Sequence, residues 1–247
     1  MKKSSWRAHL NLIGNFPKIQ MLFRVTAFGD AFYSHLLDYM RHGFRDTKLV
    51  AVETFARLLH NDFRSAVRSK YIKRMVDEFA HSNSCYSRMT FIEFCSVAAE
   101  AYSRAFFNDY GLYDSFLETA HDKVTDVKLK FLQAAPTVRK VLSFDDNKNN
   151  VRLLDCISLL TNSEIKCISD AAMDCELQLT HTKYRDPTIV AKMDEENRSK
   201  MSHERNLDLL EKEAEMEEEI KRSNESSSVS LFGGIGVSSS FSHPASQ

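Results

Sequence analysis

Two histidines are the first residues in this sequence whose types and spacing could support chemistry. His35 and His42 lie seven residues apart, which places them on nearly one face of a helix, and imidazole is a common zinc ligand. No third ligand at a suitable spacing accompanies them, and a zinc site needs at least three protein ligands. The pattern favours two ordinary histidines, and we expect neither a metal nor a cofactor.

Two aspartates resemble an acid–base pair. Asp122 and Asp126 lie one helical turn apart. We interpret Asp122 as a helix cap and Asp126 as a first-turn acid stabilised by the helix dipole. Asp109 beside Tyr110 and Tyr113 has an equally structural interpretation. The sequence also lacks the phosphate-binding, nucleophile-elbow, zinc-protease and EF-hand motifs, so we expect that the protein is not an enzyme.

The cysteines and the start of the chain bear on the compartment. Five cysteines occur without a CxxC pair, mostly within apolar helical stripes, which is typical of a reducing environment. The basic N-terminal segment is not followed by a continuous apolar stretch, and no run of eighteen apolar residues occurs. We therefore expect a cytoplasmic protein that does not associate with membranes.

Composition favours an all-α protein that does not bind nucleic acid. Seven glycines and four prolines in 247 residues are few for a fold with many turns. Residues 1–193 contain 27 basic and 22 acidic residues, whereas residues 194–222 contain 6 and 11, so neither part is strongly basic. Lys70, Lys73 and Arg74 share one helix face, and a solvated face explains them better than an anion-binding patch.

The elements that would position any functional residue recur with a fixed period. Apolar residues between Asp122 and Leu142 form one helical stripe. Sliding this segment upstream by about 40 residues repeatedly aligns similar residues. The basic column of this alignment contains His9, Lys48, Arg88 and Lys128. A period of about 40 built from two helices is typical of HEAT repeats, which stack into an α-solenoid, although an irregular helical bundle remains the alternative.

The chain is accordingly expected to contain a HEAT-type solenoid over 1–183, a linker and charged helix over 184–222, and a disordered Ser/Gly-rich tail over 223–247. The expected solenoid helices are Met1–Met21, Leu22–Arg41, Thr47–Asn61, Phe63–Phe79, Tyr86–Tyr102, Phe106–Ala120, Val124–Leu142, Val151–Leu160 and Glu164–Leu179.

The two ends of the chain carry further expectations. The first helix reads as half of an incomplete pair, with Trp6, Leu10, Ile13 and Phe16 forming a face that lacks its neighbour. The charged helix over Ile189–Lys221 keeps no sustained heptad pattern. We therefore expect a helix stabilised by (i, i+4) charge pairs, with a coiled coil as the alternative.

The segment HDKVTDVKLKFLQAAPTVRKVL resembles the HEAT repeats of scaffold subunits of protein phosphatase 2A-type enzymes. The resemblance rests on Asp122 in the turn, Val127-Lys128-Leu129 opening the second helix and Pro136 late in it. Lys128 replaces the arginine that is frequent in the family. The preceding FFNDYGLYDSFLETAHD and the order of solenoid, charged helix and serine-rich tail resemble regulatory subunits of protein phosphatase 4 in particular.

This resemblance implies a non-catalytic subunit that binds a phosphatase catalytic subunit of the protein phosphatase 4 or 2A type through the turns of successive repeats. The residues at the matching turns are Arg45, Asp46, His81, Asn83, His121, Asp122 and Lys123. Helix capping is the alternative role for each of them. The alternative function is a HEAT-repeat adaptor in intracellular transport or cytoskeletal assembly. Phe241 and Pro244 in the tail form a further, weak Phe-x-x-Pro motif.

Overall fold

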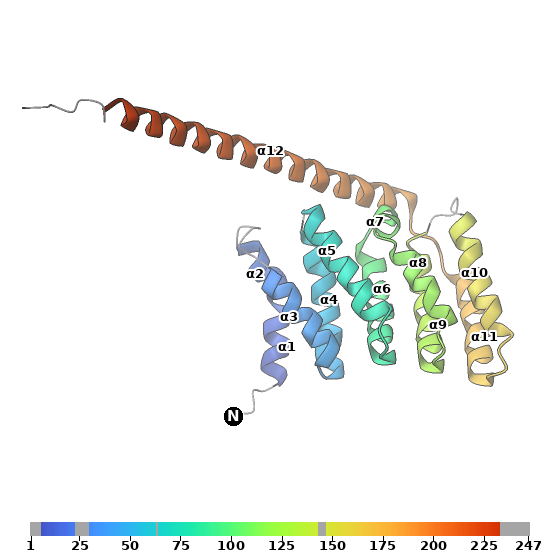
Figure 1. Ribbon diagram of the computed structural model, residues 1–247. Helices are drawn as coiled ribbons and strands as arrows, with labels where there is room; N and C mark the ends of the chain where they lie inside the picture. Colours follow the sequence, from blue (N-terminus) through green and yellow to red (C-terminus); the bar gives the residue numbers. More distant parts are fainter. Residues whose placement is uncertain (1–5, 23–29, 63, 143–146, 233–247) are drawn as a thin grey trace, which may run out of the picture. The chain divides into compact units, whose positions relative to one another are not determined.

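The computed structural model describes residues 6–22, 30–62, 64–142 and 147–232, and within these ranges the chain is all-helical without a strand (Figure 1). The chain divides into two units, Met1–Met201 and Ser202–Gln247, which are considered separately. No helix in the described ranges combines the length and apolar character that crossing a bilayer requires.

The helices of the first unit are α1 (Trp6–Gly14), α2 (Phe16–Leu22), α3 (Asp30–His42), α4 (Arg45–Asn61), α5 (Ser65–Met75), the π-helical turn η1 (Val76–Ala80), α6 (Cys85–Ala101), α7 (Arg104–Asp109), α8 (Leu112–Glu118), the 3-10 turn η2 (Thr119–His121), α9 (Thr125–Arg139), α10 (Asn147–Thr161) and α11 (Lys166–His181). Helix α12 (Pro187–Phe232) begins in the first unit and supplies the helix of the second.

The helices of the first unit form two layers. Helices α1, α4, α6, α9 and α11 contact one another in chain order, so they make one row. Helix α3 packs on α4, η1 packs on α6, and α10 packs on α11, while α8 contacts both η1 and η2. Antiparallel helix pairs therefore stack side by side (Figure 1).

A continuous aromatic core joins the first pairs. The rings of Tyr33 and Tyr71 stack with centroids 4.5 Å apart, and those of Phe55 and Phe94 meet edge to face at 5.8 Å. All four side chains are buried. Because each contact joins neighbouring helix pairs, no pair buries its apolar surface alone.

The N-terminal segment differs from the single helix that we expected. Helix α1 ends at Gly14 and α2 begins at Phe16. Ile13 and Phe16, which we expected on a face without a neighbour, are buried instead. Phe16 meets Phe32 of α3 edge to face at 4.9 Å, and α1 packs on α4. Leu12 is exposed, and the side chain of Trp6 lies outside the described residues.

The helix expected over Phe106–Ala120 is interrupted. Gly111 has a φ of 63°, a left-handed conformation that glycine adopts at low cost, and it separates α7 from α8. The helix expected to end at Phe79 instead widens into the π-helical turn η1. Both irregularities lie in the layer formed by α3, α5, α7, α8 and α10.

The last helices also differ at their boundaries. Helix α10 begins at Asn147, ahead of the expected start at Val151. Helix α12 continues to Phe232, past Arg222, and the first glycine after Arg222 is Gly233. The remainder of the expected tail, with Phe241 and Pro244, lies outside the described residues.

Candidate protein-binding surfaces

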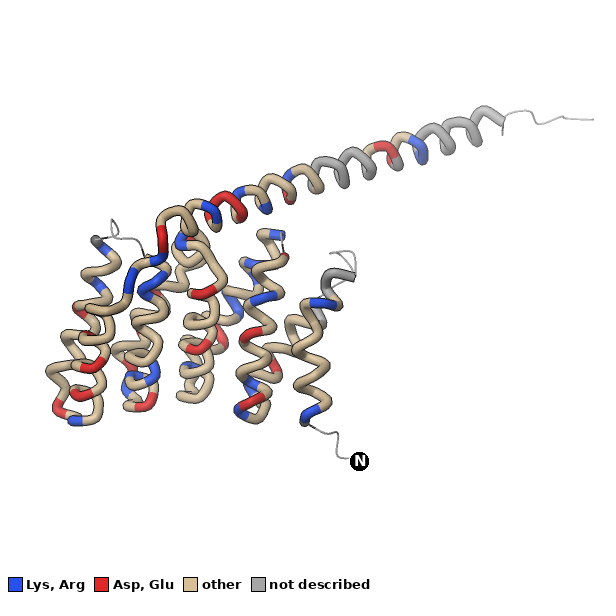
Figure 2. Tube along the Cα trace, turned by 180° about the vertical axis from the view of Figure 1, so that it is seen from behind, with Lys and Arg blue, Asp and Glu red and all other residues tan. Residues whose placement is uncertain are grey.

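The turns inside the helix pairs lie along one edge of the first unit, the lower edge in Figure 1. We call this the turn edge and define it by residues 43–46, 81–84, 121–124 and 162–165. Both acidic and basic residues lie along it (Figure 2). The structure thus brings together the turns that we expected from the repeat.

The seven candidate contact residues all lie on this edge, but they are not equivalent. Six of them are exposed, namely Arg45, Asp46, His81, Asn83, His121 and Lys123. The seventh, Asp122, has a side chain that is 8% exposed. The other six are accessible to solvent, whereas the Asp122 carboxylate is largely buried.

Asp122 joins two helix pairs. Its Oδ1 accepts a hydrogen bond from Nη2 of Arg88 at 3.0 Å, and its Oδ2 accepts one from Nε of the same guanidinium. Nη1 of Arg88 donates to the Ser82 carbonyl at 2.7 Å. Arg88 in α6 therefore ties the turn at 81–84 to the turn at 121–124. A bidentate pair of this kind fixes the relative orientation of the guanidinium and the carboxylate in addition to neutralising their charges.

The expectation that Asp122 caps α9 directly was wrong. The N-cap position belongs to Val124, whose side chain cannot accept a hydrogen bond. Asp122 Oδ1 instead accepts from the Val124 backbone N–H at 2.8 Å, which forms an Asx-turn ahead of the helix. Burial alone would raise the pKa of Asp122, but the hydrogen bonds from Arg88 and Val124 outweigh it and hold that pKa below its usual value.

A turn of the same kind, in which a side-chain oxygen accepts the N–H two residues later, precedes two other helices. Asp62 Oδ1 accepts from the Arg64 N–H at 3.0 Å ahead of α5, and Ser82 Oγ accepts from the Ser84 N–H at 3.2 Å ahead of α6. In each case the acceptor side chain lies two residues before the residue whose N–H it binds, as at Asp122. Polar residues in these turns therefore position helix starts.

Turn residues one period apart in the repeat differ in whether they offer a carboxylate to the basic residue of the preceding helix pair. Ser82, Asp122 and Asn162 occupy positions forty residues apart. Arg88 reaches Asp122, and the position equivalent to Arg88 one period earlier is Lys48, whose corresponding turn residue is the neutral Ser82. Within the described residues, no ion pair joins Lys48 to a carboxylate.

Lys48 lines a groove of about 620 Å³ beside the turn edge. Helix α4 contributes Arg45, Lys48 and Leu49 to this α4/α6 groove, and α6 contributes Tyr86 and Met89. Helix α9 closes it with Lys130, which forms an ion pair with Glu93. The volume falls in the range that accommodates a ligand or a peptide side-chain cluster.

The histidines singled out by their spacing line a different hollow of about 410 Å³. His9 joins His35 and His42 there, and His9 Nδ1 lies 2.6 Å from the Tyr39 hydroxyl. Among the described residues, however, no group of three or more His, Cys, Asp or Glu side chains is arranged to hold a metal ion. The structure thus places a third histidine in the same hollow as His35 and His42, but the three side chains do not have the arrangement of a metal site.

Cys156 of α10 and His121 of η2 also lie close together. Cys156 Sγ lies 3.9 Å from His121 Nε2. Burial raises the pKa of the Cys156 thiol, which lowers the fraction of reactive thiolate. The contact therefore has the character of packing rather than of a nucleophile and its base.

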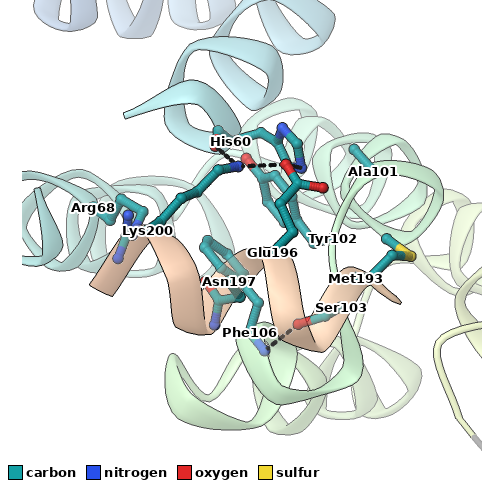
Figure 3. Close-up of a pocket in the computed structure, with 10 residues that line it drawn as sticks. All are labelled: His60, Arg68, Ala101, Tyr102, Ser103, Phe106, Met193, Glu196, Asn197 and Lys200. Atoms are coloured by element: carbon teal, nitrogen blue, oxygen red, sulfur yellow. Dashed lines mark hydrogen bonds and ion pairs between the residues drawn. The ribbon is translucent and has the colours of Figure 1, made fainter. Parts of the chain in front are cut away.

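The edge opposite the turns is covered by the beginning of α12. Lys200 Nζ donates to the His60 carbonyl at the end of α4 at 2.7 Å and lies 3.0 Å from Glu196 Oε1 (Figure 3). Arg185, just before α12, donates to the Tyr102 carbonyl at 3.0 Å and to the Ala99 carbonyl at the end of α6. Cations at helix carboxyl ends satisfy free carbonyls and favour the helix dipole.

A cavity of about 220 Å³ lies beneath these contacts (Figure 3). The His60 imidazole stacks on the Tyr102 ring with centroids 5.8 Å apart, and His60 Nε2 lies 3.9 Å from Glu196 Oε1. Burial, followed by the positive charge of Lys200, lowers the pKa of His60, although Glu196 opposes the shift. The start of α12 is thus fixed to the first unit by groups that include a titratable histidine.

Sequence reasoning missed the residues that make contacts between helix pairs. Arg88 was visible as a member of the basic column, but its partner Asp122 lies 34 residues away. Arg185 and Lys200 gave no signal, because their partners are backbone carbonyls that carry no side-chain pattern. The α4/α6 groove also required the relative placement of three helices.

No family model matches the chain. Over 164 residues it is 23% identical to serine/threonine-protein phosphatase 4 regulatory subunit 4 of Homo sapiens, in an alignment that covers 64% of this chain and 18% of the relative. The protein of the same name from Mus musculus is 22% identical over 161 residues, with the same coverage. The chain therefore spans 18% of the length of these relatives, and the relation is distant. Both relatives are named as regulatory subunits.

Proposed function

We propose that this chain is a non-catalytic scaffolding or regulatory part of a Ser/Thr protein phosphatase of the protein phosphatase 4 type. The observation that carries the proposal is the similarity, over 64% of the chain, to two proteins named as regulatory subunits of that phosphatase. The helix pairs stacked in two layers support a HEAT-type solenoid as the fold of the first unit. Its partner is then a catalytic subunit in the cytoplasm.

The turn edge is the proposed contact surface for the catalytic subunit. Its exposed residues Asp46 and Lys123 belong to two helix pairs with one further pair between them, and their order is fixed by stacking. Mixed charges favour a specific polar contact over non-specific attraction to a single charge. Asp122 serves the edge differently, because its ion pair with Arg88 holds neighbouring turns in register.

Co-purification with the protein phosphatase 4 catalytic subunit tests the proposal. The tagged chain is co-expressed with that subunit, and recovery is measured together with hydrolysis of a phosphopeptide. The double variant Asp46→Lys/Lys123→Glu should lower recovery at least tenfold, because both contact residues reverse charge. Asp122 is unsuitable for this test, since its substitution would also disturb the stack.

A matched control keeps the same charge changes away from the turn edge. Asp109 and Lys183 are exposed outside that edge, so Asp109→Lys/Lys183→Glu should leave recovery unchanged. Absence of the catalytic subunit from the wild-type preparation would contradict the phosphatase function. Equal recovery with both double variants would contradict the turn edge as the contact while leaving the function intact.

A further inference from the structure

We propose that the α4/α6 groove binds an acidic peptide segment of a partner protein, with one large apolar side chain of that segment seated between α4 and α6. The proposal rests on the charges and the apolar floor of the groove, and it does not depend on the phosphatase function. It assigns to this face a ligand of stated chemistry, and the groove shares Arg45 with the exposed turn residues proposed to contact a catalytic subunit.

The positive charge of the groove is available to a ligand. Arg45 and Lys48 both line it, and no ion pair connects either of them to a carboxylate within the described residues. Lys130 is already paired with Glu93. The groove therefore presents two cations in excess over its own carboxylate, which complements a segment with at least two acidic side chains.

The missing carboxylate has a structural cause. Arg88 is neutralised by Asp122, whereas the residues at the equivalent positions one period earlier are Lys48 and the neutral Ser82. An acidic group supplied by a ligand would occupy the place that Asp122 fills one pair further along. The groove thus contains the cation that corresponds to Arg88 but lacks the carboxylate that corresponds to Asp122.

The floor of the groove explains the apolar side chain. Leu49 and Met89 line it from facing helices, and Leu49 is 37% exposed despite its apolar side chain. Tyr86 also lines the groove and is 69% exposed, so its aromatic ring is accessible to a ligand. Aromatic and apolar anchors in a pocket surrounded by polar groups are typical of peptide recognition.

The same features disfavour a nucleic acid as the ligand. The side chains of Leu49 and Met89 offer no hydrogen bonds to phosphate groups. Nucleic-acid grooves follow the backbone with a continuous run of cations. Here Arg45 and Lys48 share the groove with the apolar side chains of Leu49 and Met89, so a peptide with both acidic and apolar side chains fits better.

Peptide display followed by fluorescence anisotropy tests the proposal. A library of random twelve-residue peptides is selected on the full chain, and we expect enrichment of peptides that combine several Asp or Glu residues with one Leu, Phe or Met. The best enriched peptide, labelled with fluorescein, then gives a dissociation constant. The variant Arg45→Glu/Lys48→Glu should weaken binding at least tenfold, and Leu49→Asp should do the same.

The matched control is Lys70→Glu/Lys73→Glu on α5, where two exposed lysines lie outside the groove. It should leave the dissociation constant within twofold of wild type. Enrichment of basic or neutral peptides, or a failure to enrich any peptide, would overturn the proposal. So would equal loss of binding in both double variants, or competition by single-stranded oligonucleotide at lower concentration than by unlabelled peptide.

Discussion

At the scale of single residues, the pair Arg88 and Asp122 combines three functions that sequence patterns treat separately. The carboxylate turns the chain ahead of α9, neutralises a guanidinium, and thereby connects two turns. Both side chains are less than 10% exposed. Removing one member leaves the other charge poorly solvated, which costs more than the pair itself contributes.

We predict that Asp122→Asn destabilises the chain by about 2 kcal/mol near neutral pH. Asparagine can still accept the Val124 N–H in the turn, so the loss isolates the charge interaction with Arg88. Chemical denaturation of wild type and variant measures the difference. Asp126→Asn, at an exposed first-turn acid of α9, is the control and should change stability by less than about 0.5 kcal/mol.

The same pair predicts a pH dependence with a definite sign. Because the folded-state pKa of Asp122 is depressed, its contribution is fully present above the unfolded-state pKa of about 4 and is lost as pH falls through the folded-state pKa. The stability gap between wild type and Asp122→Asn should therefore stay constant from pH 5 to 8. It should narrow below about pH 4. A gap that widens in acid would contradict this assignment.

At the scale of elements, the period of about 40 residues identified the helix pairs because apolar stripes depend on local spacing. Where the helices break depended on tertiary context. Asn15 separates α1 from α2, and Gly111 separates α7 from α8 through a left-handed backbone that the stripe does not encode. Asp122 was predicted to cap α9, but it accepts the Val124 N–H from a position two residues before the N-cap.

Lys48, which forms no ion pair within the described residues, leads to a prediction about Ser82. Ser82→Asp places a carboxylate where Asp122 lies one period later, and it preserves the acceptor for the Ser84 N–H. We expect a stabilisation of about 0.5 kcal/mol, because the new pair is partly exposed. A double-mutant cycle with Lys48→Met measures the coupling. If Ser82→Asp stabilises equally in the absence of Lys48, an ion pair is not the cause.

Attachment of the first turns of α12 should depend on pH. His60 has a lowered pKa in the folded chain, so the stability that it contributes is present above about pH 6.5 and is lost as pH falls through the folded-state pKa. Hydrogen exchange in residues 187–201, corrected for intrinsic rates, should therefore increase relative to α6 between pH 7 and pH 5.5.

The variant His60→Gln serves as the control for this measurement, because glutamine does not titrate. Its residues 187–201 should show the same relative protection at both pH values. Glu196 and Lys200 face His60 from α12, and Arg68 lies in the same cavity. Equal pH sensitivity in wild type and variant would assign the effect to one of those groups instead.

At the scale of the whole first unit, the last helix pair carries apolar side chains that no described helix covers. Met173 and Leu177 lie one turn apart on α11 and are 52% and 61% exposed. We predict concentration-dependent self-association that Met173→Lys/Leu177→Lys abolishes. Light scattering after size exclusion measures the mass. Ser158→Lys/Thr180→Lys, at exposed polar positions of the same pair, should leave it unchanged.

The layered stack was predictable from the sequence to the extent that repetition is visible in it. Each pair repeats a local pattern, so its neighbours follow from the period. The α4/α6 groove was not predictable, because it depends on how far α4, α6 and α9 stand apart and on which polar partners are absent. The turn residues were located by repetition, but burial of Asp122 among them appeared only once the pairs were packed together.

The single ion pair between Arg88 and Asp122 also has a mechanical consequence. It links α6 to the turn before α9 at the turn edge, whereas the residues one period earlier, at the junction of α4 and α6, are Lys48 and Ser82. Stiffness along that edge is therefore uneven. Under load or thermal bending, the α4–α6 contact should flex more readily than the α6–α9 contact, while the ion pair of Arg41 in α3 with Glu78 in η1 ties the same two pairs together in the other layer.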